Sequence, residues 1–213
     1  MSRRWQEVAR ASAGESYAEE YAERFRRLAA EGADVHGEAS FVARLRPAAP
    51  GRTTRVLDAG CGTGRVAVRL AELGYDVAGC DVDAAMVEVA REEAPALDWR
   101  VADLATLDLG ERYDVVLLAG NVVPLLEDGT LEATCVRLAA HVAPDGVLVA
   151  GFGTDADHLP DGCPVTGLDE FLAAAAAAGL GELQRWGTWA GETWRADDGY
   201  VVAVLGPAPD LVR

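Results

Sequence analysis

Lysine is absent from this sequence, so all 19 basic residues are arginines, and they are outnumbered by 35 acidic residues. The resulting net charge of −16 repels a phosphate backbone, which argues against nucleic acid as a partner. The charge is unevenly distributed along the chain. Residues 1–55 carry ten arginines and eight acidic residues, whereas residues 56–213 carry nine arginines and 27 acidic residues. Either the basic leader docks onto the acidic body, or both present solvated faces to water.

Cysteines are few, and long apolar runs are missing. The four cysteines are widely spaced and form no Cys-x-x-Cys pair, which argues against a metal site or a disulfide framework. No stretch of about 18 apolar residues lacks charges, so we expect no membrane span. The basic pair Arg3-Arg4 is followed by no apolar run, so we expect no secretory signal peptide. These absences predict a cytoplasmic protein with reduced thiols.

The 213 residues are 50% hydrophobic and 25% charged, as in ordinary globular domains. Apolar stripes predict two leader helices, at residues 12–30 and 37–45, and the prolines at 47 and 50 end this leader. Strands and helices then alternate. The predicted strands are 55–59, 76–80, 98–101, 113–118, 147–152, 182–188 and 200–205. The predicted helices between them are 65–73, 84–93, 131–141 and 168–178.

Alternating strands and helices predict an α/β fold, a doubly wound and mainly parallel sheet. The last two strands are joined without a helix, so they must run antiparallel, and the final strand enters the sheet in reverse. We therefore expect two parts, a helical leader over residues 1–50 and a sheet domain over residues 51–213.

A glycine-rich loop, Gly60-Cys61-Gly62-Thr63-Gly64, follows the first predicted strand and opens a helix. Glycines there let the backbone turn tightly and approach a ligand, while free helix N–H groups face that ligand. The glycines occupy positions 1, 3 and 5, whereas the dinucleotide fingerprint requires glycine or alanine at position 6, where Arg65 stands. This spacing disfavours a NAD(P)-linked oxidoreductase, which we keep as the weakest alternative.

Acidic residues follow the next two strands. Asp81 ends the second strand, where a carboxylate can accept both hydroxyls of a ribose. Asp103 follows the third strand and can accept a hydrogen bond from an adenine amino group. Both carboxylates are open to a second interpretation, as helix caps or as solvated loop residues.

The run from Val56 to Gly64, together with Asp81 and Asp103, resembles the signature of the class I S-adenosylmethionine-dependent methyltransferases. The resemblance extends from residue 55 to the C-terminus and implies a Rossmann-like seven-stranded sheet whose last strand is antiparallel. It also implies S-adenosylmethionine as the cofactor, with no metal. The residues that it places around the cofactor are Asp58, Gly60, Cys61, Gly62, Gly64, Asp81, Val82, Asp103, Leu104, Ala119, Gly120 and Asn121.

Methyl transfer to oxygen or nitrogen can need a base, and histidine suits this role near neutral pH. His36 lies in the leader, which in such enzymes often covers the cofactor, and His158 follows the fifth strand, so both are candidate catalytic residues. His141 ends a helix, where a contact with the helix dipole is the better explanation. Tyr17 and Tyr21 are candidate substrate contacts of the lid, although helical spacing equally predicts simple packing.

The fourth-strand segment departs from one branch of the family. Enzymes that methylate base amines or glutamine side chains resemble one another in an Asn/Asp-Pro-Pro-Tyr motif, whereas here Pro124 stands alone. We therefore expect a methyltransferase acting on a small-molecule oxygen or nitrogen acceptor, with neither nucleic acid nor membrane as a partner. The alternative is a non-catalytic cofactor-binding or regulatory protein. The sequence indicates neither the acceptor nor the oligomeric state.

Overall fold

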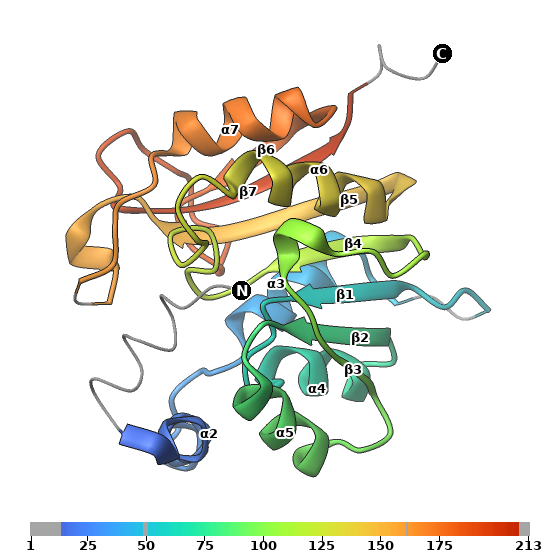
Figure 1. Cartoon of the computed structure of the whole chain (residues 1–213), viewed down its shortest axis with the longest axis vertical. Coiled ribbons are helices and arrows are strands. Elements are labelled where there is room, and N and C mark those ends of the chain that lie inside the picture. Colours follow the sequence, from blue (N-terminus) through green and yellow to red (C-terminus); the bar gives the residue numbers. More distant parts are fainter. Residues whose placement is uncertain (1–13, 49–50, 161, 209–213) are drawn as a thin grey trace.

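The computed structural model describes residues 14–48, 51–160 and 162–208 and contains one seven-stranded sheet of order β3-β2-β1-β4-β5-β7-β6 (Figure 1). The strands are β1 Arg55–Ala59, β2 Asp76–Asp81, β3 Asp98–Val101, β4 Tyr113–Leu118, β5 Val142–Gly153, β6 Leu180–Trp186 and β7 Tyr200–Pro207. Neighbours among β1 to β5 pair in parallel, whereas β7 pairs antiparallel with both β5 and β6. The predicted fold class and the reversed last strand are confirmed.

The described chain contains six α-helices and three short 3-10 helices, three of which precede the first strand. The α-helices are α2 Tyr17–Ala30, α3 Gly37–Leu45, α4 Arg65–Glu72, α5 Ala84–Glu93, α6 Leu131–His141 and α7 Leu168–Ala177. The 3-10 helices are η1 Gly14–Ser16, η2 Leu104–Thr106 and η3 Ala156–His158. The predicted start of the first helix at residue 12 lies outside the described residues.

The largest departure from the predicted elements is β5, which begins at Val142, directly after α6, rather than at Val147. Val142 already pairs with Tyr113, and an irregularity in register follows before Val115 pairs with Val147. The sequence Pro-Asp-Gly at 144–146 predicts a turn. In the structure these residues form the irregularity between the two paired parts of β5. Proline is tolerated at such a position because its missing N–H costs no ladder hydrogen bond there.

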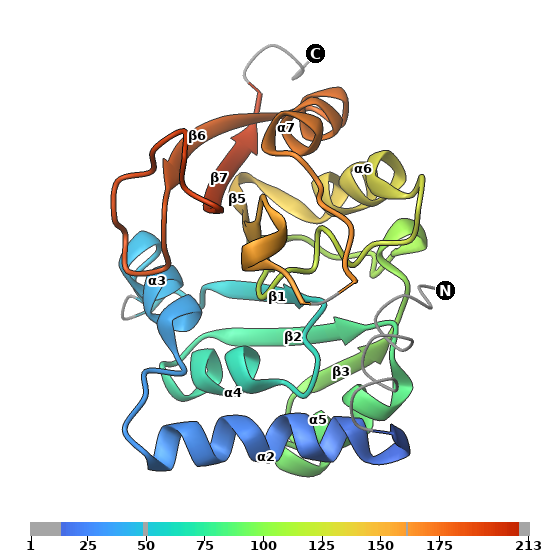
Figure 2. The same cartoon turned by 90° about the vertical axis from the view of Figure 1, so that its left-hand side faces the viewer.

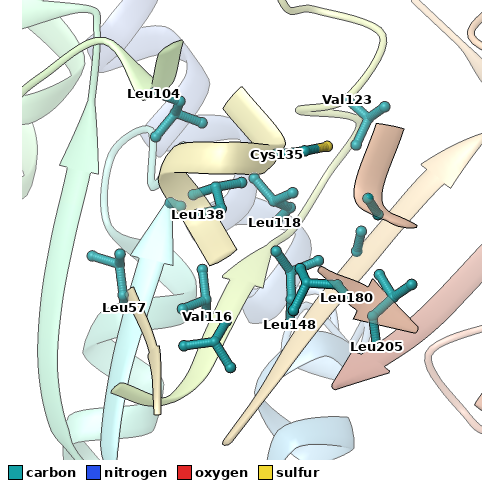
Figure 3. Close-up of a cluster of buried hydrophobic side chains, with 14 of the residues drawn as sticks. Leu57, Leu104, Val116, Leu118, Val123, Cys135, Leu138, Leu148, Leu180 and Leu205 are labelled. Carbon is teal, nitrogen blue, oxygen red and sulfur yellow. The ribbon is translucent and has the colours of Figure 1, made fainter. Parts of the chain in front are cut away.

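Two apolar clusters lie on opposite faces of the sheet, because successive strand residues point to opposite faces. One cluster joins Leu57, Val116 and Leu148 to helices α6 and α7, and Figure 3 shows these strand side chains beside Leu138 of α6. The other joins the strands to α3, α4 and α5. Since both faces are covered, the central strands are nearly continuous apolar runs.

The two leader helices pack differently. Ala39, Phe41 and Val42 of α3 are buried in the second cluster, so α3 is part of the core. Helix α2 instead runs along the outside of α5 (Figure 2), where Tyr17 and Met86 are buried against each other. No helix within the described residues is long and apolar enough to cross a membrane.

Candidate active site

The glycine-rich loop joins β1 to α4 and adopts a backbone that only glycine adopts readily. Gly60, Gly62 and Gly64 have φ angles of 83°, 53° and 82°. The N–H groups of Gly60 and Cys61 both donate to the carbonyl oxygen of Cys80 in β2, at 2.8 and 3.0 Å. A Cβ atom at Gly60 would lie 2.6 Å from the Val122 side chain. The loop is therefore held against both neighbouring strand ends.

The Asp81 carboxylate is tied into this loop. Its Oδ2 accepts the N–H of Gly62 at 2.9 Å, and its Oδ1 accepts the N–H of Asp83 at 2.9 Å. Burial raises the pKa of Asp81, and these backbone donors act in the opposite direction. Each carboxylate oxygen has further lone-pair capacity, so Asp81 can also accept from a ligand hydroxyl.

Asp58 is the most unusual side chain of the site. It is 1% exposed, and neither carboxylate oxygen has a hydrogen-bond partner within the described residues. Burial raises its pKa to about 7, and the positive charge of Arg65 opposes that rise. A buried carboxyl group without partners is costly, so a positively charged ligand beside it would be bound favourably.

A cavity opens at this edge of the sheet, where the parallel strands end and open α/β sheets bind their ligands. Ten of the twelve predicted cofactor residues line it. They are Asp58, Gly60, Cys61, Gly62, Asp81, Val82, Asp103, Leu104, Ala119 and Gly120. Asp103 additionally caps η2, because its Oδ1 accepts the N–H of Ala105 at 3.0 Å.

The other two predicted residues, Gly64 and Asn121, are not in the cavity lining. Gly64 lies against Trp99, where a Cβ atom would be 2.6 Å from the indole ring, so this glycine permits close packing of helix and strand. Asn121 has a φ of 67°. Its Oδ1 accepts the N–H of Gly153 at 2.7 Å, and its Nδ2 donates to the carbonyl oxygen of His158 at 3.3 Å.

The leader reaches the cavity through Tyr21, which lines it and whose pKa is raised by burial. Tyr17 does not line the cavity. Its hydroxyl donates to the Asp83 carboxylate at the start of α5, so its position is explained by packing and capping. The structure thus brings one of the two predicted leader tyrosines to the site.

Arg65 connects the leader to the glycine-rich loop. Its guanidinium group forms two hydrogen bonds with the Glu38 carboxylate, at 2.6 and 3.0 Å, and donates to the carbonyl oxygen of Val35. It also lies over the Phe25 ring of α2, 4.6 Å from the ring centroid. Both α2 and α3 are therefore attached to a residue that lines the cavity.

The three histidines occupy different environments. His36 lines a separate cleft with residues of α2 and α4, so the structure does not bring it to the cavity. His141 is buried, its Nδ1 lies 2.7 Å from the carbonyl oxygen of Arg137, and its Nε2 accepts the N–H of Leu109. Hydrogen bonds therefore explain His141 better than a dipole contact. His158 pairs with Asp155 beside a third cleft.

Nine residues of the cavity lining are not among those predicted from the sequence. These residues are Thr63, Arg65, Val66, Met86, Val122, Leu125, Leu126, Glu127 and Thr130. The lining residues that follow β4 continue directly from the predicted segment at 119–121, so their position in the chain could have identified them as site residues. Met86 and Val66 lie on helices that follow predicted site residues, and only the packing shows which side chains face the cavity.

The lining fits the cofactor that the resemblance implies. S-adenosylmethionine carries a sulfonium and an ammonium group, for which the buried carboxyl group of Asp58 is a suitable neighbour. Asp81 retains acceptor capacity for ribose hydroxyls, and the glycine-rich loop leaves space that side chains would fill. Val82, Met86 and Leu104 supply apolar surface for a flat ring.

Comparisons with known proteins agree with this geometry. Residues 56–146 match the family described as "Methyltransferase domain". The chain is 33% identical over 120 residues to a dTDP-3-amino-3,6-dideoxy-alpha-D-glucopyranose N,N-dimethyltransferase of Streptomyces fradiae, covering 56% of this chain and 47% of that protein. The chain thus spans about half the length of such curated relatives.

Solved structures cover more of the chain. A TehB-like SAM-dependent methyltransferase from Corynebacterium glutamicum aligns with a TM-score of 0.80 and 30% identity, covering 90% of this chain and 98% of that one. CalS10, an amino pentose methyltransferase from Micromonospora echinaspora, aligns with a TM-score of 0.65 and 26% identity, covering 87% and 95%.

Proposed function

The chain belongs to the class I S-adenosylmethionine-dependent methyltransferases, and from this membership we propose that it methylates an oxygen or nitrogen atom of a small-molecule acceptor. The observation that carries the proposal is the cavity at the carboxyl ends of the strands. It combines the glycine-rich loop, the carboxylate of Asp81 and the buried carboxyl group of Asp58.

When bound, S-adenosylmethionine would supply an electrophilic methyl group on a sulfonium sulfur, a good leaving group. The protein residues bind and orient. Asp81, Asp58 and Tyr21 all line the cavity: Asp81 would accept hydrogen bonds from the ribose, Asp58 would stabilise positive charge, and Tyr21 would border the cofactor on the leader side. Alignment of donor and acceptor accounts for much of the rate in such displacements, on the order of 7–11 kcal/mol.

A small acceptor suits the charge of the chain, since the net charge of −16 opposes approach to nucleic acid. Among the relatives, the proteins from Streptomyces fradiae and Saccharopolyspora spinosa are named as N,N-dimethyltransferases of amino sugars, and two others as ubiquinone biosynthesis O-methyltransferases. We also propose a reducing, cytoplasmic environment, which is supported by the buried free thiols of Cys61, Cys80 and Cys135.

Calorimetric titration and a turnover assay test the proposed function. We expect S-adenosylmethionine and S-adenosylhomocysteine to bind, and NAD to give no heat. With an acceptor panel of amines, phenols and carboxylates, we expect release of S-adenosylhomocysteine. Binding of NAD without binding of either sulfur compound would overturn the assignment. Binding without turnover of any acceptor would instead support the non-catalytic alternative.

A further inference from the structure

The third cleft, with a volume of about 790 Å³, opens beside η3 and the connection between β6 and β7. Its lining includes one imidazole, two aromatic side chains and three further charged groups, namely His158, Trp189, Tyr200, Glu192, Arg195 and Asp198. Trp189 donates from its indole N–H to the Tyr200 hydroxyl at 2.9 Å. Its ring also packs against Phe41 of α3, with centroids 5.5 Å apart, so the aromatic wall is fixed to the core.

His158 forms a dyad with Asp155. Its Nδ1 lies 2.7 Å from Asp155 Oδ1, and the same oxygen accepts the backbone N–H of His158 at 3.1 Å. An ionised carboxylate can only accept, so Nδ1 carries a proton, and in the neutral form of the imidazole Nε2 has a lone pair that can accept one. The hydrogen bond from His158 lowers the pKa of Asp155, which keeps this carboxylate ionised. The imidazole is 48% exposed, so it can exchange protons with water.

Two glycines make room for this dyad. A Cβ atom at Gly199 would lie 2.1 Å from His158 Nδ1 and 2.2 Å from Asp155 Oδ2. A Cβ atom at Gly153 would lie 2.5 Å from the carbonyl oxygen of His158. The dyad is therefore packed against bare backbone of β5 and of the residue preceding β7, and its position is set by the fold.

The dyad is connected to the cofactor cavity through Asn121. The Asn121 side chain bonds the backbone of Gly153 and of His158, whereas its two chain neighbours, Gly120 and Val122, line the cofactor cavity. Arg65, another residue of the cavity lining, lies within electrostatic reach of Tyr200 and lowers its pKa, against the larger effect of burial. The side chain of Asn121 thus links His158 of the cleft to the chain segment that lines the cavity proposed to hold the methyl donor, although the cleft and the cavity share no lining residue.

We propose that this cleft binds an aliphatic amine as the methyl acceptor, and that His158, oriented by Asp155, removes the proton that the acceptor ammonium must lose. The inference rests on the proposed function. In this step the ammonium N–H bond breaks, its electron pair remains on the acceptor nitrogen as the nucleophilic lone pair, and a new N–H bond forms at Nε2. The proton then passes from the exposed imidazole to water.

Charge and acidity together favour an amine over the other acceptors. Glu192 and Asp198 in the cleft and the neighbouring Asp155 outnumber Arg195, so a cation is attracted and a phenolate repelled. An imidazole base can deprotonate a group of moderate acidity such as an ammonium, whereas an aliphatic alcohol is too weak an acid. The cleft therefore suits an amine that arrives protonated.

Matched pairs of acceptors test the substrate class. Glucosamine, putrescine and glycine are compared with glucose, 1,4-butanediol and glycolate, because the members of each pair differ by an amine or a hydroxyl group. We expect release of S-adenosylhomocysteine with at least one amine and not with its hydroxyl counterpart. Turnover of a hydroxyl compound at a similar rate, or of no amine, would overturn the amine assignment. Failure of the proposed function is distinguishable from failure of the amine assignment, because S-adenosylhomocysteine would then not bind.

The role of His158 is tested on that amine. We expect His158→Ala to lower kcat/KM at least about 100-fold, to leave the Kd for S-adenosylhomocysteine within twofold, and to regain turnover when imidazole is added. Asp155→Asn should lower kcat more than it changes KM. Unchanged turnover in His158→Ala, or a loss that imidazole does not relieve, would overturn the assigned role.

Gly199→Ala displaces the dyad while keeping both of its side chains. We expect it to lower kcat/KM at least about tenfold with an unchanged Kd for S-adenosylhomocysteine. Gly181→Ala is the matched control, because no atom of the described residues lies within 4 Å of a Cβ atom at that strand position. Equal activity of the two glycine variants would show that the position of the dyad does not matter, against the proposal.

Discussion

The pair of Arg65 and Glu38 offers a quantitative test of how the leader is attached to the site. Their closest atoms are 2.6 Å apart, and the two side chains are only 17% and 13% exposed. In Glu38→Gln the shape is kept and the negative charge is lost, so Arg65 stays in a partly desolvated position with only neutral acceptors, the glutamine amide oxygen and the Val35 carbonyl oxygen.

The expected cost follows from this burial. Removing one partner of a fully buried ion pair costs about 3–5 kcal/mol. Because both side chains retain some contact with water and the glutamine oxygen still accepts a hydrogen bond, we expect a loss of roughly 2–3 kcal/mol in the free energy of unfolding. For a chain of this size, each kcal/mol lowers Tm by about 2–4 °C, so the expected shift is roughly 4–12 °C.

Urea denaturation and thermal melting measure this loss, with Glu72→Gln as the matched control. Glu72 pairs with Arg69 at 2.8 Å, but these side chains are 57% and 40% exposed, so its removal should cost less than about 0.5 kcal/mol. The attachment of the leader to Arg65 can also be measured by proteolysis, because trypsin cleaves after arginine and α2 contains Arg24, Arg26 and Arg27. We expect faster cleavage within α2 in Glu38→Gln than in Glu72→Gln. Equal destabilisation by the two variants, or equal rates of cleavage within α2, would refute the reasoning.

Three further predictions concern the cofactor cavity. Because burial raises the pKa of Asp58 from 3.8 to about 7, its stabilising contribution is full below pH 4 and lost as pH rises through 7. Asp58→Asn should therefore gain roughly 2–4 kcal/mol over the ligand-free parent at pH 8 but not at pH 4; a pH-independent difference in urea titrations would contradict this. Asp81→Asn should weaken S-adenosylhomocysteine binding by roughly 1.5–3 kcal/mol in calorimetry, whereas the exposed Asp108→Asn should leave it unchanged. Gly60→Ala combines a φ of 83° with a contact of 2.6 Å to Val122, so it should lower Tm and ligand affinity together; a parent-like melt would show that the loop is less constrained than described.

Much of the architecture was predictable because its signals are local. The helix at 131–141 and the strands at 98–101 and 113–118 have the predicted bounds, since turn residues and apolar periodicity mark them directly. The start of β5 was not predictable in this way. Pro144 indicates the end of an element, but pairing of Val142 with Tyr113, 29 positions earlier in the chain, carries the strand through it.

The candidate site was partly predictable for a related reason. Parallel strands bring their carboxyl ends to one edge, so residues that follow each strand meet there without knowledge of the packing. Tyr17 and Tyr21 show the limit of this reasoning. Both belong to one helical stripe, yet only Tyr21 lines the cavity, while Tyr17 is bonded to Asp83.

The sequence alone determined the order of strands and helices, the glycine-rich turn and the acids at the strand ends, because each depends on residues close together in the chain. Tertiary structure alone decided that Asp58 has no hydrogen-bond partner within the described residues, that Arg65 joins Glu38, and that Gly199 makes room for the dyad of His158 and Asp155. These properties depend on desolvation and on contacts between groups far apart in the sequence, and neither can be predicted from local sequence patterns.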